Sequence, residues 1–157
     1  MIRTFLIALF AIFVFVPTTQ AQEAFESTAC YSGTATMLHS SKELTVMSFE
    51  LKGIVRSNAN SEIFNNASEM VVGLVCQKGD EITQRGFGKY LYLNGDVIIM
   101  EWDGKANDGT WKLLLGTGKW EGIKGSGTWS ILQRVKPIAP GTHQGCRTIK
   151  GTYELPK

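Results

Sequence analysis

The sequence has few of the residues that most often bind metals, with two histidines and three cysteines in 157 residues. Neither His39 nor His143 stands near a cysteine or the other histidine at the spacing of a metal site. We therefore predict no metal site and no other cofactor. Both histidines are interpreted as exposed residues in loops.

An excess of charge of one sign is also lacking, since 16 basic side chains are balanced by 14 acidic ones. The lysines are scattered rather than clustered, so the basic patch of a nucleic-acid-binding protein is missing and we expect no nucleic-acid partner. The glycines of residues 116–122 match neither a dinucleotide fingerprint nor a phosphate loop, in which serine or threonine would replace Trp120 after Lys119. A nucleophile elbow of the Gly-x-Ser-x-Gly kind is missing as well.

Long apolar runs are missing except at the start of the chain, where residues 5–16 are all apolar. Arg3 precedes this run, Pro17 ends it, and small residues lead up to Ala21. The run is shorter than the roughly 20 residues that span a bilayer, and its flanks are typical of a secretory signal peptide. We predict that residues 1–21 are a signal peptide and that residues 22–157 form one domain. The protein would then be exported, either periplasmic or secreted, and would not span a membrane after cleavage.

Helical periodicity is scarce, whereas alternation of apolar and polar residues with period two is frequent, which is typical of strands. Asn94 and Gly95 stand between two alternating runs, which is a strong signal for a hairpin. A polar stretch at residues 56–68 is interpreted as a long loop with one helical turn. The pattern predicts about eight strands, at residues 30–37, 44–55, 70–76, 83–93, 96–102, 110–115, 126–133 and 147–155.

Eight short antiparallel strands in one small domain favour a closed barrel or a sandwich. Closure removes the exposed strand edges that promote aggregation, so the predicted fold is all-β, a single closed antiparallel barrel of about eight strands. An outer-membrane barrel would carry an apolar outer band with aromatic girdles. The polar faces here carry Glu, Lys and Thr, which argues against that class.

Tryptophan and glycine are concentrated late in the chain. Trp102, Trp111, Trp120 and Trp129 are spaced nine residues apart. Trp102 and Trp111 flank the predicted turn at residues 103–110 symmetrically, so we expect a cross-strand pair with the two rings in contact. Glycines on the face of Trp129 would leave room for a ring or for a bent strand.

The segment LGTGKWEGIKGSGTW at residues 115–129 resembles a glycine-rich signature of allene oxide cyclase-like and dirigent-like β-barrels. Exported bacterial proteins of unknown function that share this barrel are part of the resemblance, which spans residues 62–133. It implies that residues 116–122 wrap across one end of the barrel, with Trp120 as a plug. Leu115 replaces the first glycine of the signature, and no active-site residue of the cyclases has a counterpart here. The resemblance therefore implies a fold rather than a catalytic activity.

Glu101 is the single weak candidate for a catalytic residue. It alternates with Val97 and Ile99, so it would be a buried carboxylate if that face of the strand pointed inward, and buried carboxylates are candidates for function. A position at the end of a strand near the barrel mouth is the simpler interpretation, because charged residues are rarely fully buried.

Barrels of this size can hold one small ligand. We therefore predict an exported binding protein for a small apolar or aromatic ligand, with a site formed by Tyr92, Trp102, Trp111 and Trp129. One alternative is a cyclase or isomerase that folds a reactive intermediate inside the barrel. Another is a carbohydrate-binding module, which would require exposed, coplanar tryptophan rings.

The three cysteines predict one disulfide and one unpaired thiol in an oxidising compartment. If Cys30 starts the first strand, alternating strand directions bring Cys76 and Cys146 to the same end of the barrel and leave Cys30 a strand length away. The predicted disulfide is therefore Cys76–Cys146. One additional strand within residues 56–68 would change the pairing to include Cys30.

Overall fold

The structure is a computed structural model that describes residues 22–58 and 61–156. The predicted signal peptide, residues 1–21, lies outside the described residues. Within them, no helix is long and apolar enough to cross a membrane. The elements are β1 (Glu23–Ser40), β2 (Leu44–Asn58), β3 (Ala67–Lys78), β4 (Glu81–Leu91), β5 (Val97–Lys105), β6 (Asp108–Gly116), the 3-10 helix η1 (Gly118–Trp120), β7 (Lys124–Arg134) and β8 (Thr142–Glu154).

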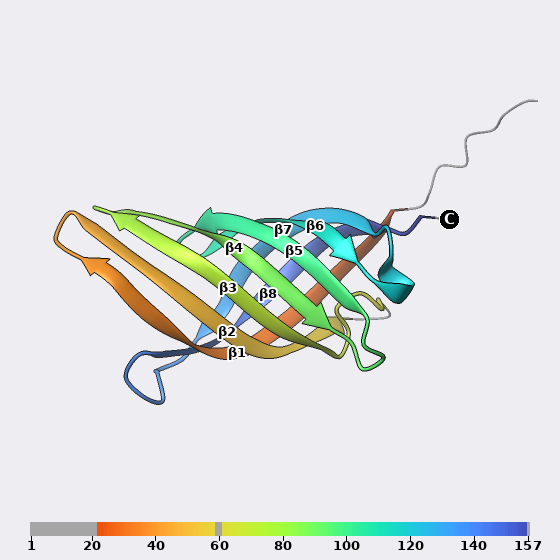
Figure 1. Cartoon of the computed structure of the whole chain (residues 1–157), viewed down its shortest axis with the longest axis horizontal. Coiled ribbons are helices and arrows are strands. Elements are labelled where there is room, and N and C mark those ends of the chain that lie inside the picture. Colours follow the sequence, from red (N-terminus) through yellow and green to blue (C-terminus); the bar gives the residue numbers. More distant parts are fainter. Residues whose placement is uncertain (1–21, 59–60, 157) are drawn as a thin grey trace, which may run out of the picture.

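Each strand pairs antiparallel with the next, and β8 pairs with β1 to close the barrel (Figure 1). The prediction of an all-β fold with one closed antiparallel barrel of eight strands is confirmed. Several strand boundaries differ from the sequence interpretation, among them the start of β8 at Thr142, five residues before the predicted start. β1 begins at Glu23, seven residues before the predicted start, and β2 continues through the first part of the predicted loop at residues 56–68. The described remainder of that loop, residues 61–66, contains a hydrogen-bonded turn and no helix.

Alternation along each strand decides which side chains enter the barrel. In β5, Ile98, Met100 and Trp102 are buried inside, while Val97 and Glu101 lie on the outer face. The same alternation holds along the regular parts of the other strands, because successive side chains of a strand point to opposite faces. It is interrupted at register shifts between β1 and β2, β5 and β6, and β7 and β8. The inner faces therefore supply one common core along the barrel axis.

We call the end at which β1 begins the filled end, because side chains occupy its interior. Residues 61–66, between β2 and β3, turn inward there, and both Ile63 and Phe64 are fully buried. The Phe64 ring lies 4.4 Å from that of Tyr90 and 5.4 Å from that of Phe25, measured between centroids. The polar loop expected from the sequence is therefore partly a plug, since its two large apolar residues, Ile63 and Phe64, enter the barrel.

The segment after β6 closes the rest of the filled end. η1 crosses that end of the barrel (Figure 1), and Trp120 within it is 2% exposed. Its ring packs 5.1 Å from Tyr92. Gly118 has a φ of +55°, and a Cβ there would collide with the Asp96 carboxylate, so only glycine suits this position. The role of Trp120 as a plug, implied by the resemblance, is confirmed.

The hairpin at Asn94 and Gly95 is present, but its turn differs from the tight two-residue form that an Asn-Gly pair favours. Gly95 N–H donates to the Tyr92 carbonyl (3.0 Å), and Asp96 N–H donates to the side-chain oxygen of Asn94 (3.0 Å). Of the two central residues, Gly95 adopts a positive φ, +88°. The Asn94 side chain therefore stabilises a longer loop between β4 and β5.

Glycine pairs in the wall accommodate the tryptophan rings. Gly73 of β3 lies opposite Gly86 of β4, and a Cβ on either would come within 2.8 Å of the Trp102 ring. Gly127 and Gly151 form a second pair, against which the Trp111 ring packs. The wall thus lacks side chains where the largest rings must fit, which explains why the two residue types occur together in the sequence.

The predicted Cys76–Cys146 disulfide is wrong, because the structure pairs Cys30 with Cys146. The two residues stand directly opposite each other in the β1–β8 register, with their Cα atoms 4.1 Å apart. The prediction failed because it placed Cys30 at the start of the first strand, whereas it lies midway along β1. Among the described residues, Cys76 is the cysteine left unpaired, exposed near the end of β3.

Candidate functional site in the barrel lumen

A cavity of about 360 Å³ occupies the lumen beyond the filled end. It opens where the turns β1–β2, β3–β4 and β5–β6 lie, at the left of Figure 1, which we call the open end. Exposed side chains line its outer part, so the cavity reaches solvent. These outer lining residues include Gln77, Arg134 and His143.

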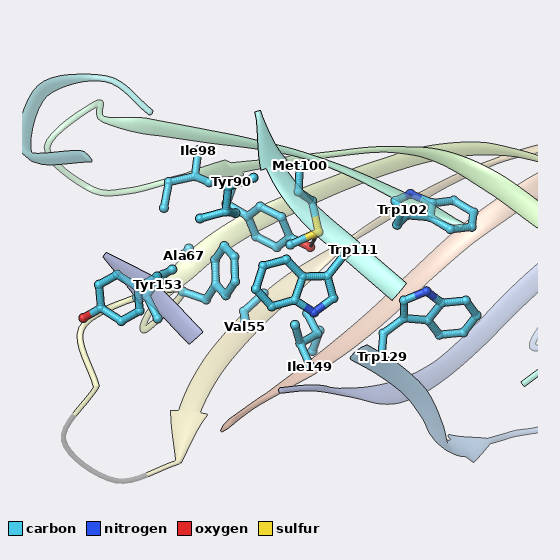
Figure 2. Packing of buried hydrophobic residues seen from close by; sticks show 14 of the residues in the cluster. Val55, Ala67, Tyr90, Ile98, Met100, Trp102, Trp111, Trp129, Ile149 and Tyr153 are labelled. Carbon is cyan, nitrogen blue, oxygen red and sulfur yellow. Dashed lines mark hydrogen bonds between the residues drawn. The ribbon is translucent and has the colours of Figure 1, made fainter. Parts of the chain in front are cut away.

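Three tryptophans form much of the cavity wall. Trp102, Trp111 and Trp129 all line the lumen, as Figure 2 shows. The indole N–H of Trp111 donates to the Thr128 carbonyl, and that of Trp129 donates to the Asp103 carbonyl, each at 3.0 Å. Because these two rings are tied to the wall at their polar edges, they offer a rigid apolar surface to a ligand.

Trp102 and Trp111 pair across the two strands as predicted, but the predicted contact between their rings is wrong. The two residues are opposite each other across β5 and β6. Their rings diverge, however: Trp102 packs edge-on against Trp129, 6.0 Å between centroids, whereas Trp111 packs against Phe25 and Phe64. The ring planes of Trp102 and Trp129 are 88° apart, and all three tryptophans are buried. This is not the exposed, coplanar surface that a carbohydrate-binding module requires.

A buried ion pair lies deep in the lumen. Arg147 of β8 donates to the Glu69 carboxylate of β3 at 2.5 Å, and the Glu69 side chain is fully buried. The second carboxylate oxygen of Glu69 has no hydrogen-bond partner within the described part of the chain. A buried pair of this kind is costly to break, since removal of one partner leaves an uncompensated charge.

Burial and charge act on this pair in opposite directions. Burial raises the pKa of Glu69 above its usual range, and the charge of Arg147 opposes that shift. Burial alone would lower the pKa of Arg147, but the neighbouring Glu69 carboxylate and the Tyr90 hydroxyl hold it above its usual value. Arg147 therefore stays protonated, and Glu69 is the member of the pair that titrates first as the pH falls.

Two tyrosines surround the ion pair. The Tyr90 hydroxyl donates to the Met100 sulfur at 3.4 Å, and both side chains line the cavity (Figure 2). The Arg147 guanidinium lies over the Tyr31 ring, 5.2 Å from its centroid. Burial raises the pKa of both tyrosines. They therefore remain neutral hydrogen-bond donors at physiological pH.

The remaining sequence-predicted residues lie elsewhere. Glu101 is not inside the barrel, since it lies on the outer face of β5 and pairs with Lys112 at 2.6 Å. Tyr92 lies in the filled end, where the Phe64 N–H donates to its hydroxyl at 2.8 Å, so it does not line the cavity.

His39 and His143 are exposed, but both belong to strands rather than loops. No three His, Cys, Asp or Glu side chains cluster as metal ligands within residues 22–58 and 61–156.

Glu69 and Arg147 were missed by the sequence interpretation, although a signal for each was present. The third strand was predicted to start at Met70, one residue too late to include Glu69. With the strand extended, Glu69 shares the inner face with Ala67 and Val71. Arg147 likewise alternates with the buried Ile149 and Tyr153 on the inner face of β8. A charged residue at the same alternating positions as the buried apolar residues of a strand is the pattern that identifies this site.

No family model matches the sequence, and no curated protein matches it. The fold is similar to that of dirigent proteins. The structure of the pterocarpan synthase dirigent protein GePTS1 aligns with a TM-score of 0.53 and 9% identity, covering 88% of this chain and 94% of that one. The pterocarpan synthase dirigent protein PsPTS1 aligns with a TM-score of 0.52 and 9% identity, covering 91% of this chain and 99% of that one. At this identity, the likeness shows a shared barrel fold.

Proposed function

We propose that this protein is a binding protein that holds a small apolar or aromatic ligand in the barrel lumen. The observation that carries the proposal is the cavity of about 360 Å³, walled by Trp102, Trp111 and Trp129 and open at one end. Ligand sites are commonly clefts of roughly 300–1,000 Å³ with apolar walls and a few polar groups. The lumen fits that description.

The wall is also preformed. Two of its tryptophans are fixed by hydrogen bonds to backbone carbonyls, so little side-chain ordering is required when a ligand binds. The polar groups of Tyr90 and Arg147 lie at the floor of the cavity, where they would orient a polar substituent of the ligand. Two of the structural neighbours are pterocarpan synthase dirigent proteins, which supports a role for this barrel with a small molecule.

Export is part of the proposal. The Cys30–Cys146 disulfide supports it, because disulfides persist mainly in oxidising compartments. The signal peptide predicted at residues 1–21 agrees with that compartment, as does the resemblance to exported bacterial proteins, which favours a periplasmic or secreted location. Intact-mass measurement of the exported protein tests this, since the mature chain should begin at Gln22.

A second candidate function is that of a cyclase or isomerase. The observation that favours it is the buried Glu69–Arg147 pair beside Tyr90. Buried carboxylates with a raised pKa are frequent at catalytic sites. In this alternative the aromatic wall would hold a reactive intermediate, and the floor would stabilise charge that develops on it.

The test of the binding function uses N-phenyl-1-naphthylamine, an uncharged aromatic probe whose fluorescence increases in apolar sites. Ala35 lies on the inner face of β1 and lines the cavity, while Thr36 is the next residue and faces outward. We expect Ala35→Trp to block the lumen and abolish binding, and Thr36→Trp to leave it unchanged. Lack of binding by the unsubstituted protein, or equal binding by both variants, would contradict the proposal.

Native mass spectrometry of the exported protein from its own host would identify a co-purified small molecule. Release of that molecule by Ala35→Trp, but not by Thr36→Trp, would connect it to the lumen. Turnover of the molecule that is lost in Glu69→Gln would favour the enzymatic alternative.

A further inference from the structure

The ionisable groups in the cavity are distributed unevenly. Of the described residues that line it, Tyr31, Tyr90, Arg134, His143 and Arg147 can ionise, and none of the lining residues is a carboxylate. Glu69 neutralises Arg147 from below the cavity floor. Arg134 forms no ion pair within the described chain, so its charge is the one left uncompensated. The cavity therefore presents a positive rim above a neutral floor.

Arg134 reaches the lumen because of an irregularity in β7. Trp129 and Ile131 lie on the inner face, so strict alternation would place Gln133 inside and Arg134 outside. The register with β8 shifts between Ile131 and Gln133, and Arg134 consequently stands opposite Gly145. Bulges of this kind redirect a side chain and are frequent beside functional sites. The bulge moves one cation from solvent to the cavity rim.

The surroundings of Arg134 leave its guanidinium available. One of its N–H groups donates to the Ala106 carbonyl at 3.0 Å, which fixes the side chain at the rim. An arginine has five N–H donors, so others remain for a ligand. Gly145 provides space, since a Cβ there would approach the Tyr31 hydroxyl to 3.1 Å. His143 lies on the same inner face of β8, two residues before Gly145.

We infer that the ligand of this barrel is amphiphilic, with an apolar or aromatic body in the lumen and an anionic group, such as a carboxylate or sulfonate, bound at the rim by Arg134. Tyr31 and His143 add hydrogen-bond donors to the same group. A guanidinium suits this role because it binds carboxylate and similar anions through two parallel hydrogen bonds. The inference rests on the proposed function and adds the chemical class of the ligand to it.

The test compares two probes that differ by one anionic group. N-phenyl-1-naphthylamine is uncharged, and 8-anilino-1-naphthalenesulfonate is the same ring system with a sulfonate. We expect the protein to bind the sulfonate more tightly, by about tenfold, as is typical of a charge-assisted hydrogen bond. Arg134→Gln should abolish this preference and leave the affinity for the uncharged probe unchanged. Arg134→Lys should keep part of the preference.

Arg85→Gln is the matched control, because Arg85 is exposed on the outer face of β4 and its loss changes the net charge equally. It should alter neither affinity. Equal affinities for the two probes, or a preference that persists in Arg134→Gln, would overturn the inference while leaving lumen binding intact. Binding of neither probe would instead overturn the proposed function.

Discussion

The two ends of the barrel differ although the same eight strands form both. At the filled end, Phe64 and Trp120 are buried against other aromatic rings. At the open end, the interior is a cavity rather than a packed core, and an inner side chain such as that of Met47 is only partly buried.

This difference separates stability from binding along the barrel axis. Packing energy is concentrated where the β2–β3 segment and η1 enter the barrel. The cavity wall near the open end contributes less, because its side chains have few partners to lose. Binding can therefore vary at the open end without loss of the fold, and the following predictions test that separation.

Phe64→Ala should give the largest effect, a loss of about 3–5 kcal/mol in the free energy of unfolding, because it empties a fully buried site. Met47→Ala, at a half-buried position that lines the cavity, should cost about 1 kcal/mol or less. Urea denaturation of both variants measures the contrast. Equal losses would show that the two ends do not differ in energetic terms.

Arg147→Met should destabilise the protein by about 3–5 kcal/mol, because Glu69 would remain buried without its partner. The double variant Arg147→Met with Glu69→Leu should recover most of that loss, since neither charge remains. A double-mutant cycle from denaturation curves gives the coupling. If the double variant is as unstable as the single one, the pair does not act as a unit.

Loss of the disulfide should cost about 2–4 kcal/mol, because Cys30 and Cys146 close a loop with a sequence separation of 116 residues. The variant is Cys30→Ala with Cys146→Ala, and Cys76→Ser is its control. We expect no change in stability from the control. Peptide mapping under non-reducing conditions should recover Cys30 linked to Cys146, and a linkage to Cys76 would refute the pairing.

Stability should depend on pH through Glu69. Its pKa is raised by burial in the folded state, so the folded protein binds the proton more tightly than the unfolded chain does. The stability of the protein relative to Glu69→Gln should therefore fall as the pH rises above about 4.5, and level off above the folded pKa. Denaturation midpoints between pH 4 and 8 measure this.

The smallest effect is expected for the pair of Glu101 and Lys112 on the outer face of the barrel. Both side chains are well exposed, so Lys112→Ala should change stability by less than about 1 kcal/mol. Neither this variant nor Glu101→Gln should alter probe binding. A loss of binding would restore Glu101 as a functional residue.

The fold could be predicted from the sequence because the alternation of apolar and polar residues can be read along one strand at a time. All eight strands and the β4–β5 hairpin could be predicted from it. The Trp120 plug was implied by the resemblance of residues 115–129 to a glycine-rich signature of dirigent-like barrels. That glycines make room for tryptophan rings could be expected from the sequence. Which ring packs against which glycine could not, because that depends on the register across several strands.

The disulfide and the site could not be predicted reliably, because both depend on where a strand begins. A start at Cys30 instead of Glu23 moved that cysteine from the middle of β1 to its end and changed the pairing. A start at Met70 removed Glu69 from the inner face. The bulge in β7 that redirects Arg134 has no clear mark in the sequence, since the residue types of Leu132 and Gln133 do not show which side chain faces inward. Strand ends and bulges are set by pairing with neighbours, which a single segment does not encode.

The position of the disulfide determines how the barrel would respond to mechanical tension. Glu23 lies opposite Tyr153, so the first and last described strands start and finish at the same end of the barrel. Force applied at residues 22 and 156 would therefore peel β1 from β8 one residue pair at a time. Cys30 and Cys146 interrupt that sequence after a few pairs, and the chain between them is shielded from the load while the disulfide is intact. The extension before rupture is thus limited to the short segments outside the two cysteines, and reduction would release the full length of the barrel.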